Sequence, residues 1–483
     1  MFRVSSPMRA DKRIGQFRGF ASSLALSLAL ATGGAIAVTA AAPAQAQSDA
    51  PQYSKAFAKA AQKASEDLNA ARNRPEVATE ITNLIAASKA LGAARDAAAI
   101  AAANSQMQAI GARIQGMTTA EKQEILALLG EAKNGDEKYL TGDFMAFLGN
   151  FSADRDLRLQ GLKLKLDSGV LKPEAIAPTW LDIAQIYYDS NRFDDAHKAY
   201  DTAYGAGNMD AAIYATDVLY KSNRAIEGLD YLEGVINARL VAGLSVPQTW
   251  YGNGLTQARN MGDPARVAHW AALYGSRGNS PESWNASIKL LMDSTKFGLQ
   301  EQLDIYRLMK RTGALLSAND YVGYIEAADA RSMANEVLPA LNEAIGKGLL
   351  TSDAATAQGP AAQLVEFTQT ALEVANRRAP EDRNTIGQIV ADARASATGI
   401  DARDAGDVYQ SFGAAAEAEE MFKLALSKGG VDNDRVLTRL GIVQADQGKF
   451  DEARASFVKV SGIRAPIATL WLAWLDTKSA PTV

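Results

Sequence analysis

Two windows of the chain repeat one order of large and small side chains over two consecutive helix-length segments. The first window contains Trp180, Ile183, Ala184, Tyr187, Ala196, Tyr200 and Ala203. The second window keeps the order with Leu437, Leu440, Gly441, Gln444, Gly448, Phe450, Ala453 and Phe457. A small residue on one helix leaves room for a large side chain on the next, so this order is typical of helices that pack at close range. The pattern predicts stacked helical hairpins and an all-α fold.

Spacings between matching residues indicate a repeat of 32 to 35 residues. Ser222-Asn223-Arg224 lies 32 residues after Ser190-Asn191-Arg192, and Gly441 lies 35 residues after Gly406. The side-chain order and this spacing resemble the tetratricopeptide repeat, whose period is about 34 residues. The resemblance implies an α-solenoid of helix-turn-helix repeats, which presents a concave groove to a partner and carries no chemistry of its own.

The resemblance divides the chain into regions of different character. It is close over residues 176–205 and 402–461 and degenerate over 206–350. We expect five regions, namely a signal peptide (1–46), an alanine-rich helical region (47–138), degenerate helical repeats (139–350), a linker with helices (351–401) and C-terminal repeats with an apolar final helix (402–483).

Glycine and proline punctuate the predicted helices. Gly169, Gly243, Gly348 and Gly430 each follow an amphipathic segment, and each precedes an apolar residue. A glycine in this place typically takes a left-handed conformation, and the next apolar residue folds back onto the last helical turn. Gln358-Gly359-Pro360 and Arg378-Ala379-Pro380 are expected to break helices, and a hinge between two blocks of repeats is expected there.

The N-terminus has the features of an export signal. An apolar stretch covers residues 20–42, and Ala44-Gln45-Ala46 offers a small-residue cleavage site. Basic residues precede the stretch at Arg3, Arg9, Lys12, Arg13 and Arg18. We expect cleavage after Ala46 and a periplasmic or secreted protein; the alternative is an uncleaved membrane anchor.

Composition narrows the function. The chain has no cysteine, so disulfides, thiolate metal sites and cysteine nucleophiles are excluded. The formal net charge is −5, and residues 1–46 carry five basic and one acidic side chain, which leaves the remaining chain at about −9. This balance argues against a nucleic-acid or anionic-membrane partner.

Candidate catalytic and metal-binding residues are few. The sequence contains no H-E-x-x-H, G-x-S-x-G or P-loop motif, and Gly205-Ala206-Gly207 follows a predicted helix rather than a strand. The only histidines, His197 and His269, have no neighbouring ligand residues. The paired carboxylates Asp194-Asp195 and Glu419-Glu420 are expected on solvated faces. We therefore expect no enzyme activity, cofactor or metal.

Candidate binding residues follow from the resemblance. Positions next to the packing residues would line the concave groove, where Tyr and Arg are typical anchors. These positions are Leu181, Gln185, Tyr188, Asp217 and Tyr220, and, in the C-terminal repeats, Arg403, Asp407, Gln410, Arg435, Thr438 and Ile442.

The final helix carries an apolar stripe formed by Ile467, Leu470, Trp471 and Trp474, with Leu475 beside it. The stripe either packs on the hairpin of residues 436–461 or exposes Trp471 and Trp474 as a second interface.

The favoured function is a non-enzymatic periplasmic scaffold that presents its groove to a peptide or helix segment of another protein. The alternative is an accessory, glycan-contacting subunit of envelope polysaccharide export or synthesis, in which Tyr188 and Tyr220 would stack on sugars. A third hypothesis is a glycan-cleaving enzyme, which an acid pair lining one cavity would favour.

Overall fold

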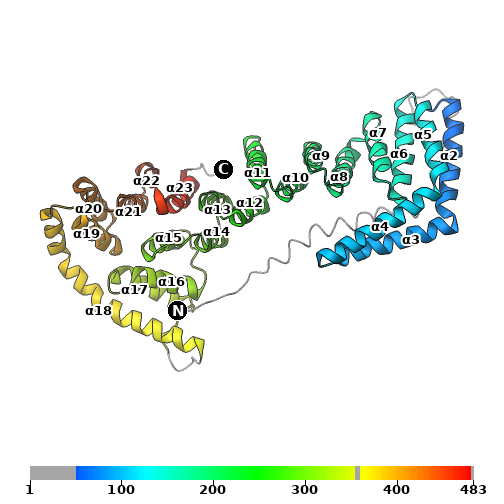
Figure 1. Ribbon diagram of the computed structural model, residues 1–483. Coiled ribbons are helices and arrows are strands. Elements are labelled where there is room, and N and C mark those ends of the chain that lie inside the picture. The colour runs from blue at the N-terminus through cyan, green and yellow to red at the C-terminus, as the bar shows by residue number, and fades with distance from the viewer. Residues whose placement is uncertain (1–50, 354–358, 480–483) are drawn as a thin grey trace. The chain divides into compact units, whose positions relative to one another are not determined.

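The computed structural model describes residues 51–353 and 359–479 (Figure 1). The expected signal peptide and its cleavage site at Ala46 lie outside the described residues. Within these ranges the fold is all-α, with no strand, and most consecutive helices pack on one another, so the predicted fold class is confirmed. The helices form two compact units, Met1–Gly228 and Leu229–Val483.

The described helices of the first unit are α2 (Lys55–Asn73), α3 (Pro75–Ala93), α4 (Ala97–Met117), α5 (Thr119–Glu131), α6 (Gly135–Phe151), α7 (Arg155–Asp167), α8 (Pro173–Asp189), α9 (Phe193–Gly205) and α10 (Ala211–Lys221); α11 (Ala225–Val241) crosses the division. One apolar core runs from α2 to α7, with Phe57, Leu84 and Phe144 fully buried.

The turns that precede α9 and α11 repeat one geometry. Asn191 and Asn223 have φ values of 56° and 62°, in the left-handed region that asparagine tolerates. The amide of the following arginine donates to the carbonyl of residue 187 in the first turn and 219 in the second, in each case at 2.9 Å. The 32-residue spacing therefore reports a real structural repeat.

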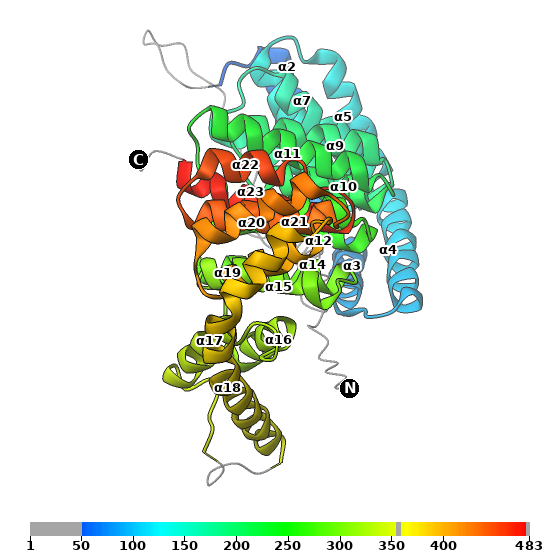
Figure 2. The same cartoon turned by 90° about the vertical axis from the view of Figure 1, so that its left-hand side faces the viewer.

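The helices of the second unit are α12 (Gln248–Met261), α13 (Pro264–Gly278), α14 (Pro281–Ser294), α15 (Leu299–Arg311), α16 (Ala318–Ala328), α17 (Ala334–Gly346), α18 (Pro360–Ala395), α19 (Ile400–Ser411), α20 (Ala415–Lys428), α21 (Asn433–Asp446), α22 (Phe450–Phe457), the 3-10 helix η3 (Gly462–Arg464) and α23 (Ala465–Ser479). Figure 2 shows the long helix α18 beside α17, on which it packs.

The interlocking of small and large residues is present as predicted. A Cβ on Gly406 would lie 2.6 Å from the ring of Phe422, and one on Gly441 would lie 2.7 Å from the ring of Phe457. These distances are shorter than van der Waals contact, so only glycine lets the rings approach. The same contact recurs at the predicted interval of 35 residues.

The expected helix-ending glycines all have positive φ: Gly169 75°, Gly243 69°, Gly348 69° and Gly430 73°. After two of these glycines the next apolar residue stays largely exposed: Val170 is 44% exposed and Leu244 is 51% exposed.

The expected break at Arg378-Ala379-Pro380 is wrong, because α18 runs through Pro380. Proline removes one backbone donor but can be tolerated where packing holds the helix. Here Asn335 of α17 donates to the carbonyl of Ala379 at 3.1 Å and accepts from Arg383 at 2.8 Å, which fixes both sides of the proline.

The final helix packs rather than exposing its stripe. Trp471 and Trp474 are buried, and α23 packs on α13, α22 and α15. The ring of Trp471 stacks on Phe457 at 5.7 Å, and Trp474 meets Phe450 edge-on at 6.3 Å. The alternative in which these tryptophans form an exposed second interface is therefore corrected. We call α21, α22, η3 and α23 the C-terminal arm, which returns to α13 and α15 of its own unit.

Glu419 differs from its expected place on a solvated face, because it is 5% exposed. Lys423 and Lys449 each lie 2.7 Å from its carboxylate, and Gln447 donates at 2.8 Å. Burial alone would raise the pKa of Glu419, but these hydrogen bonds outweigh it and lower the pKa to about 2. Its neighbour Glu420 remains exposed and pairs with Arg394.

We expect the ion pairs of Glu419 to make the second unit sensitive to acid. The unfolded chain protonates a glutamate near its ordinary pKa of about 4.3, so the stabilisation is complete above that pH and is lost as pH falls toward 2. Glu419→Gln should flatten the rise of melting temperature between pH 2 and 5, whereas Glu420→Gln should leave it unchanged. Equal slopes in wild type and Glu419→Gln would contradict this account.

Candidate binding cavity

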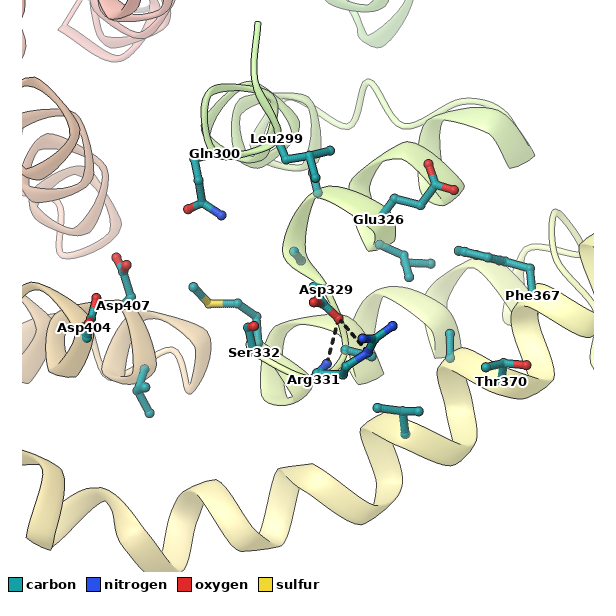
Figure 3. A pocket seen from close by; sticks show the side chains of 18 of the residues that line it. Leu299, Gln300, Glu326, Asp329, Arg331, Ser332, Phe367, Thr370, Asp404 and Asp407 are labelled. Atoms are coloured by element: carbon teal, nitrogen blue, oxygen red, sulfur yellow. Dashed lines mark hydrogen bonds and ion pairs between the residues drawn. The ribbon is translucent and has the colours of Figure 1, made fainter. Parts of the chain in front are cut away.

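A recess of about 910 Å³ lies within the second unit. We call it the main cavity. Its walls are the start of α15, the end of α16, the turn of residues 329–333, one face of α18, and α19 with α21 (Figure 3). Helices from separate hairpins thus converge on one space, as is typical of ligand-binding recesses.

Part of the lining is apolar. Phe367 and Val374 lie two turns apart on the same face of α18. Leu299, Ile325 and Met333 come from the opposite walls. Ile325 and Met333 are buried, but Leu299 is 58% exposed. The cavity therefore presents apolar surface to solvent.

The charged lining is predominantly acidic. Arg331 and Arg435 are its two basic residues, and its carboxylates are Glu326, Asp329, Glu366, Asp404 and Asp407. Three of the carboxylates pair with arginines: Asp329 with Arg331, Asp404 with Arg403, and Asp407 with Arg435. Glu326 and Glu366 have no cationic partner among the residues that the structure describes.

Asp329 sits at the rim in an unusual backbone conformation. Its φ is 55° and its ψ is 112°, a combination that L residues rarely adopt. The amides of Ser332 and Met333 donate to its carbonyl at 2.8 and 2.9 Å, and its side chain accepts from the amide of Arg331 at 3.0 Å. These bonds hold the 329–333 turn in one shape at the cavity edge (Figure 3).

A buried arginine joins two walls of the main cavity. Arg439 donates through Nη2 to Oε1 of Gln300 on α15 at 2.6 Å, and its Nη1 lies 2.5 Å from Oδ1 of Asp407 on α19. Asp407 also accepts from Nη2 of Arg435 at 2.6 Å. Desolvation, with the nearby charge of Arg439, lowers the pKa of Arg435, while its contact with Asp407 opposes that effect.

The structure brings together only some of the predicted groove residues of the C-terminal repeats. Asp407 and Arg435 line the main cavity. Thr438 and Ile442 are buried, and Gln410 lines a second recess of about 550 Å³ together with Ile442. Arg403 pairs with its neighbour Asp404 at 2.7 Å. The binding roles stay predictions, but in this conformation Thr438 cannot touch a partner.

The predicted groove residues of the first unit are partly used in packing. Tyr188 meets Phe193 edge-on at 5.9 Å, and the ring of Tyr220 fills the space beside Gly228. Burial raises the pKa of both tyrosines, helped by Asp217. The Tyr220 hydroxyl is buried and has no hydrogen-bond partner among the described residues.

Gln185 and Leu181 lie on α8 of the same unit. Gln185 lines a polar recess of about 640 Å³, donates to Asp189 at 2.7 Å and accepts from Tyr200 at 3.2 Å. Leu181 is half-buried. A contact of these residues with a partner stays a prediction.

Sequence reasoning missed α18 and the charges on α15. The contact of Gln300 with Arg439 spans 139 residues and α18 matches no repeat, so neither leaves a repeat pattern in the sequence. The acidic character of residues 326–329 was the one available hint.

Metal-binding groups and membrane-spanning helices were both looked for in the described ranges. They contain no group of three or more His, Cys, Asp or Glu side chains placed to hold a metal ion. No helix in them is both long and apolar enough to cross a bilayer.

Comparisons with known proteins leave the chain without a demonstrated family. No family model matches it, and no curated protein matches it. Among solved structures, the crystal structure of the APC/C hetero-tetramer Cut9–Hcn1 matches at 10% identity over 77% of this chain and 87% of that chain. The TM-score is 0.17, so this likeness carries no argument about function.

Proposed function

We propose that the protein is a non-enzymatic helical-repeat scaffold of the tetratricopeptide type, which holds a segment of a partner protein in the main cavity. The observation that carries the proposal is the cavity itself: about 910 Å³, built by helices of separate hairpins, with both apolar and charged side chains in its lining. Such a composition matches protein interfaces, whose centres are apolar and whose rims are polar.

The lining selects the chemistry of the occupant. Phe367 and Val374 offer apolar contact, and Glu366 lies one residue from Phe367 with no cationic partner in the described chain. A segment that places an apolar side chain next to a lysine or arginine would satisfy both features. Arg439 fixes the two walls in advance, which reduces the entropy lost on binding.

The N-terminal sequence bears on the compartment in which the protein acts. The basic start, apolar stretch and Ala44-Gln45-Ala46 motif favour export and cleavage after Ala46. The scaffold would then meet its partner in the periplasm.

A displayed peptide library tests this function. Random peptides are selected on the purified protein and then on the Phe367→Ala variant. We expect selected peptides to share an apolar residue beside Lys or Arg and to lose binding to the variant. Peptides that bind both proteins equally would place the binding surface elsewhere, and no enrichment at all would overturn the function.

We expect Glu366→Lys to weaken binding of a selected cationic peptide by about tenfold, equal to about 1.4 kcal/mol, because it places like charge beside the ligand. Glu373→Lys is the matched control, since it makes the same change on α18 outside the cavity lining. Titration calorimetry at low and high salt checks both variants. The difference in peptide affinity between the wild type and Glu366→Lys should be smaller in high salt, because ions screen exposed charges.

A second candidate, a glycan-cleaving enzyme, is favoured by one observation. Glu326 on α16 and Glu366 on α18 line the same cavity, and paired carboxylates carry glycoside hydrolysis. Incubation with peptidoglycan tests it: release of soluble fragments that Glu326→Gln or Glu366→Gln abolishes would support this candidate. Absence of turnover by the wild type would remove it.

A further inference from the structure

Asp304 on α15 is the centre of a fully buried ion cluster. Its carboxylate receives Nη1 of Arg307 at 3.1 Å and Nε of Arg439 at 3.2 Å, and it also accepts from Arg464. Asp304, Arg439 and Arg464 are each at most 1% exposed. Further carboxylates complete the cluster, because Glu336 pairs with Arg307, Asp407 with Arg439, and Glu301 with Arg464.

The cluster joins segments that are far apart in sequence. Arg439 belongs to α21 and Arg464 to η3, 135 and 160 residues after Asp304. Trp471 of α23 adds a hydrogen bond from Nε1 to the backbone carbonyl of Asp304 at 3.2 Å. Arg311 at the end of α15 pairs with Asp446 at the end of α21. The returning C-terminal arm therefore meets α15 mainly through charged groups.

A joint of this kind depends on its central anion. Burial would raise the pKa of Asp304, but Arg439, Arg464 and Arg307 outweigh burial and lower it, so the carboxylate stays ionised. A buried ion pair gains little net stability over solvated charges, because each ion loses its hydration. The arm is also held by the apolar side chains of α23, which packs on α13. Loss of the anion leaves Arg439 and Arg464 buried with only Asp407 and Glu301 as partners, which weakens the contact with α15.

The same cluster shapes the main cavity. Arg439 contacts Asp304 in the joint and, at the same time, Gln300 and Asp407, which line the cavity from opposite walls. Figure 3 shows these two lining residues on separate helices. If the arm left α15, Arg439 would leave with α21, and the two walls would lose their common anchor.

We propose that the Asp304 cluster is a latch: the C-terminal arm of the second unit opens and closes on α15, and the main cavity exists only in the closed form. An occupant of the cavity then favours closure by its differential affinity for the closed form. The C-terminal arm can open and close without an occupant. Only the coupling of closure to binding rests on the proposed function.

Distance measurements between two spin labels test the latch. The chain has no cysteine, so cysteines introduced at Lys296 before α15 and Lys459 before η3 can be labelled selectively. We expect one short distance in the labelled wild type and an added longer population in Asp304→Asn. Arg454→Gln is the control, because it removes an exposed ion pair between α22 and α23 that does not involve α15.

A wild-type distance distribution in folded Asp304→Asn would overturn the latch. If circular dichroism shows that Asp304→Asn does not fold, Arg464→Gln decides, since it removes one of three arginines and keeps the anion. Unchanged distances in Arg464→Gln would then overturn the latch. A peptide selected on the wild type should shorten the distances in the variant. Longer distances in the variant, with no peptide bound by the wild type, would keep the latch and reject the proposed function.

Discussion

Replacing Gly161 with alanine is expected to lower the free energy of unfolding of the first unit by about 3 kcal/mol. Helices α6 and α7 pack backbone to backbone at this point. A Cβ on Gly161 would lie 2.5 Å from the carbonyl oxygen of Gly142 and 2.5 Å from the amide nitrogen of Ala146. Because both atoms belong to the backbone, no side-chain rotation can relieve the clash, and the two helices must separate.

Gly130→Ala is the matched control for Gly161→Ala. Gly130 lies in α5 of the same unit, and no atom lies within 4 Å of the position that its Cβ would take. Alanine should stabilise the helix there by about 0.5–1 kcal/mol. Urea unfolding followed by circular dichroism measures both. Equal effects at the two positions would show that α6 and α7 are not held as closely as the structure has them.

The repeated hairpins could be predicted because their determinants are local. Gly406 and Phe422 meet within one hairpin, as do Gly441 and Phe457, and each contact needs only a small residue opposite a ring. The turns at Asn191 and Asn223 likewise depend on residues that are adjacent in sequence. Contacts of this range leave a pattern that a single sequence can reveal.

The cavity could not be predicted because its determinants are not local. The resemblance placed Asp407 and Arg435 on an open wall, but Arg439, one turn after Arg435, is the residue that ties Asp407 to α15. A charged residue inside an amphipathic helix gives no sign of a partner more than 130 residues away. Glu419 was misplaced for the same reason, since Lys449 and Gln447 reach it from the following hairpin.

Removal of the buried anion gives the second large effect: Asp304→Ala should destabilise the second unit by about 3–5 kcal/mol. The variant leaves Arg439 and Arg464 buried without their shared carboxylate, while Arg307 keeps Glu336. Intrinsic fluorescence during urea unfolding isolates this unit, because five of the six tryptophans of the chain lie in it.

A second substitution should recover part of that loss. In Asp304→Ala with Arg439→Met, a buried cation that has lost one of its two carboxylates is replaced by an apolar side chain, while Asp407 keeps Arg435. The loss in the double variant should therefore fall below the sum of the two single losses by about 1–3 kcal/mol. Arg454→Ala, at an exposed pair, should change stability by less than about 1 kcal/mol. Additive losses at Asp304 and Arg439 would mean that the cluster acts as separate contacts and that α15 is not where the arm is held.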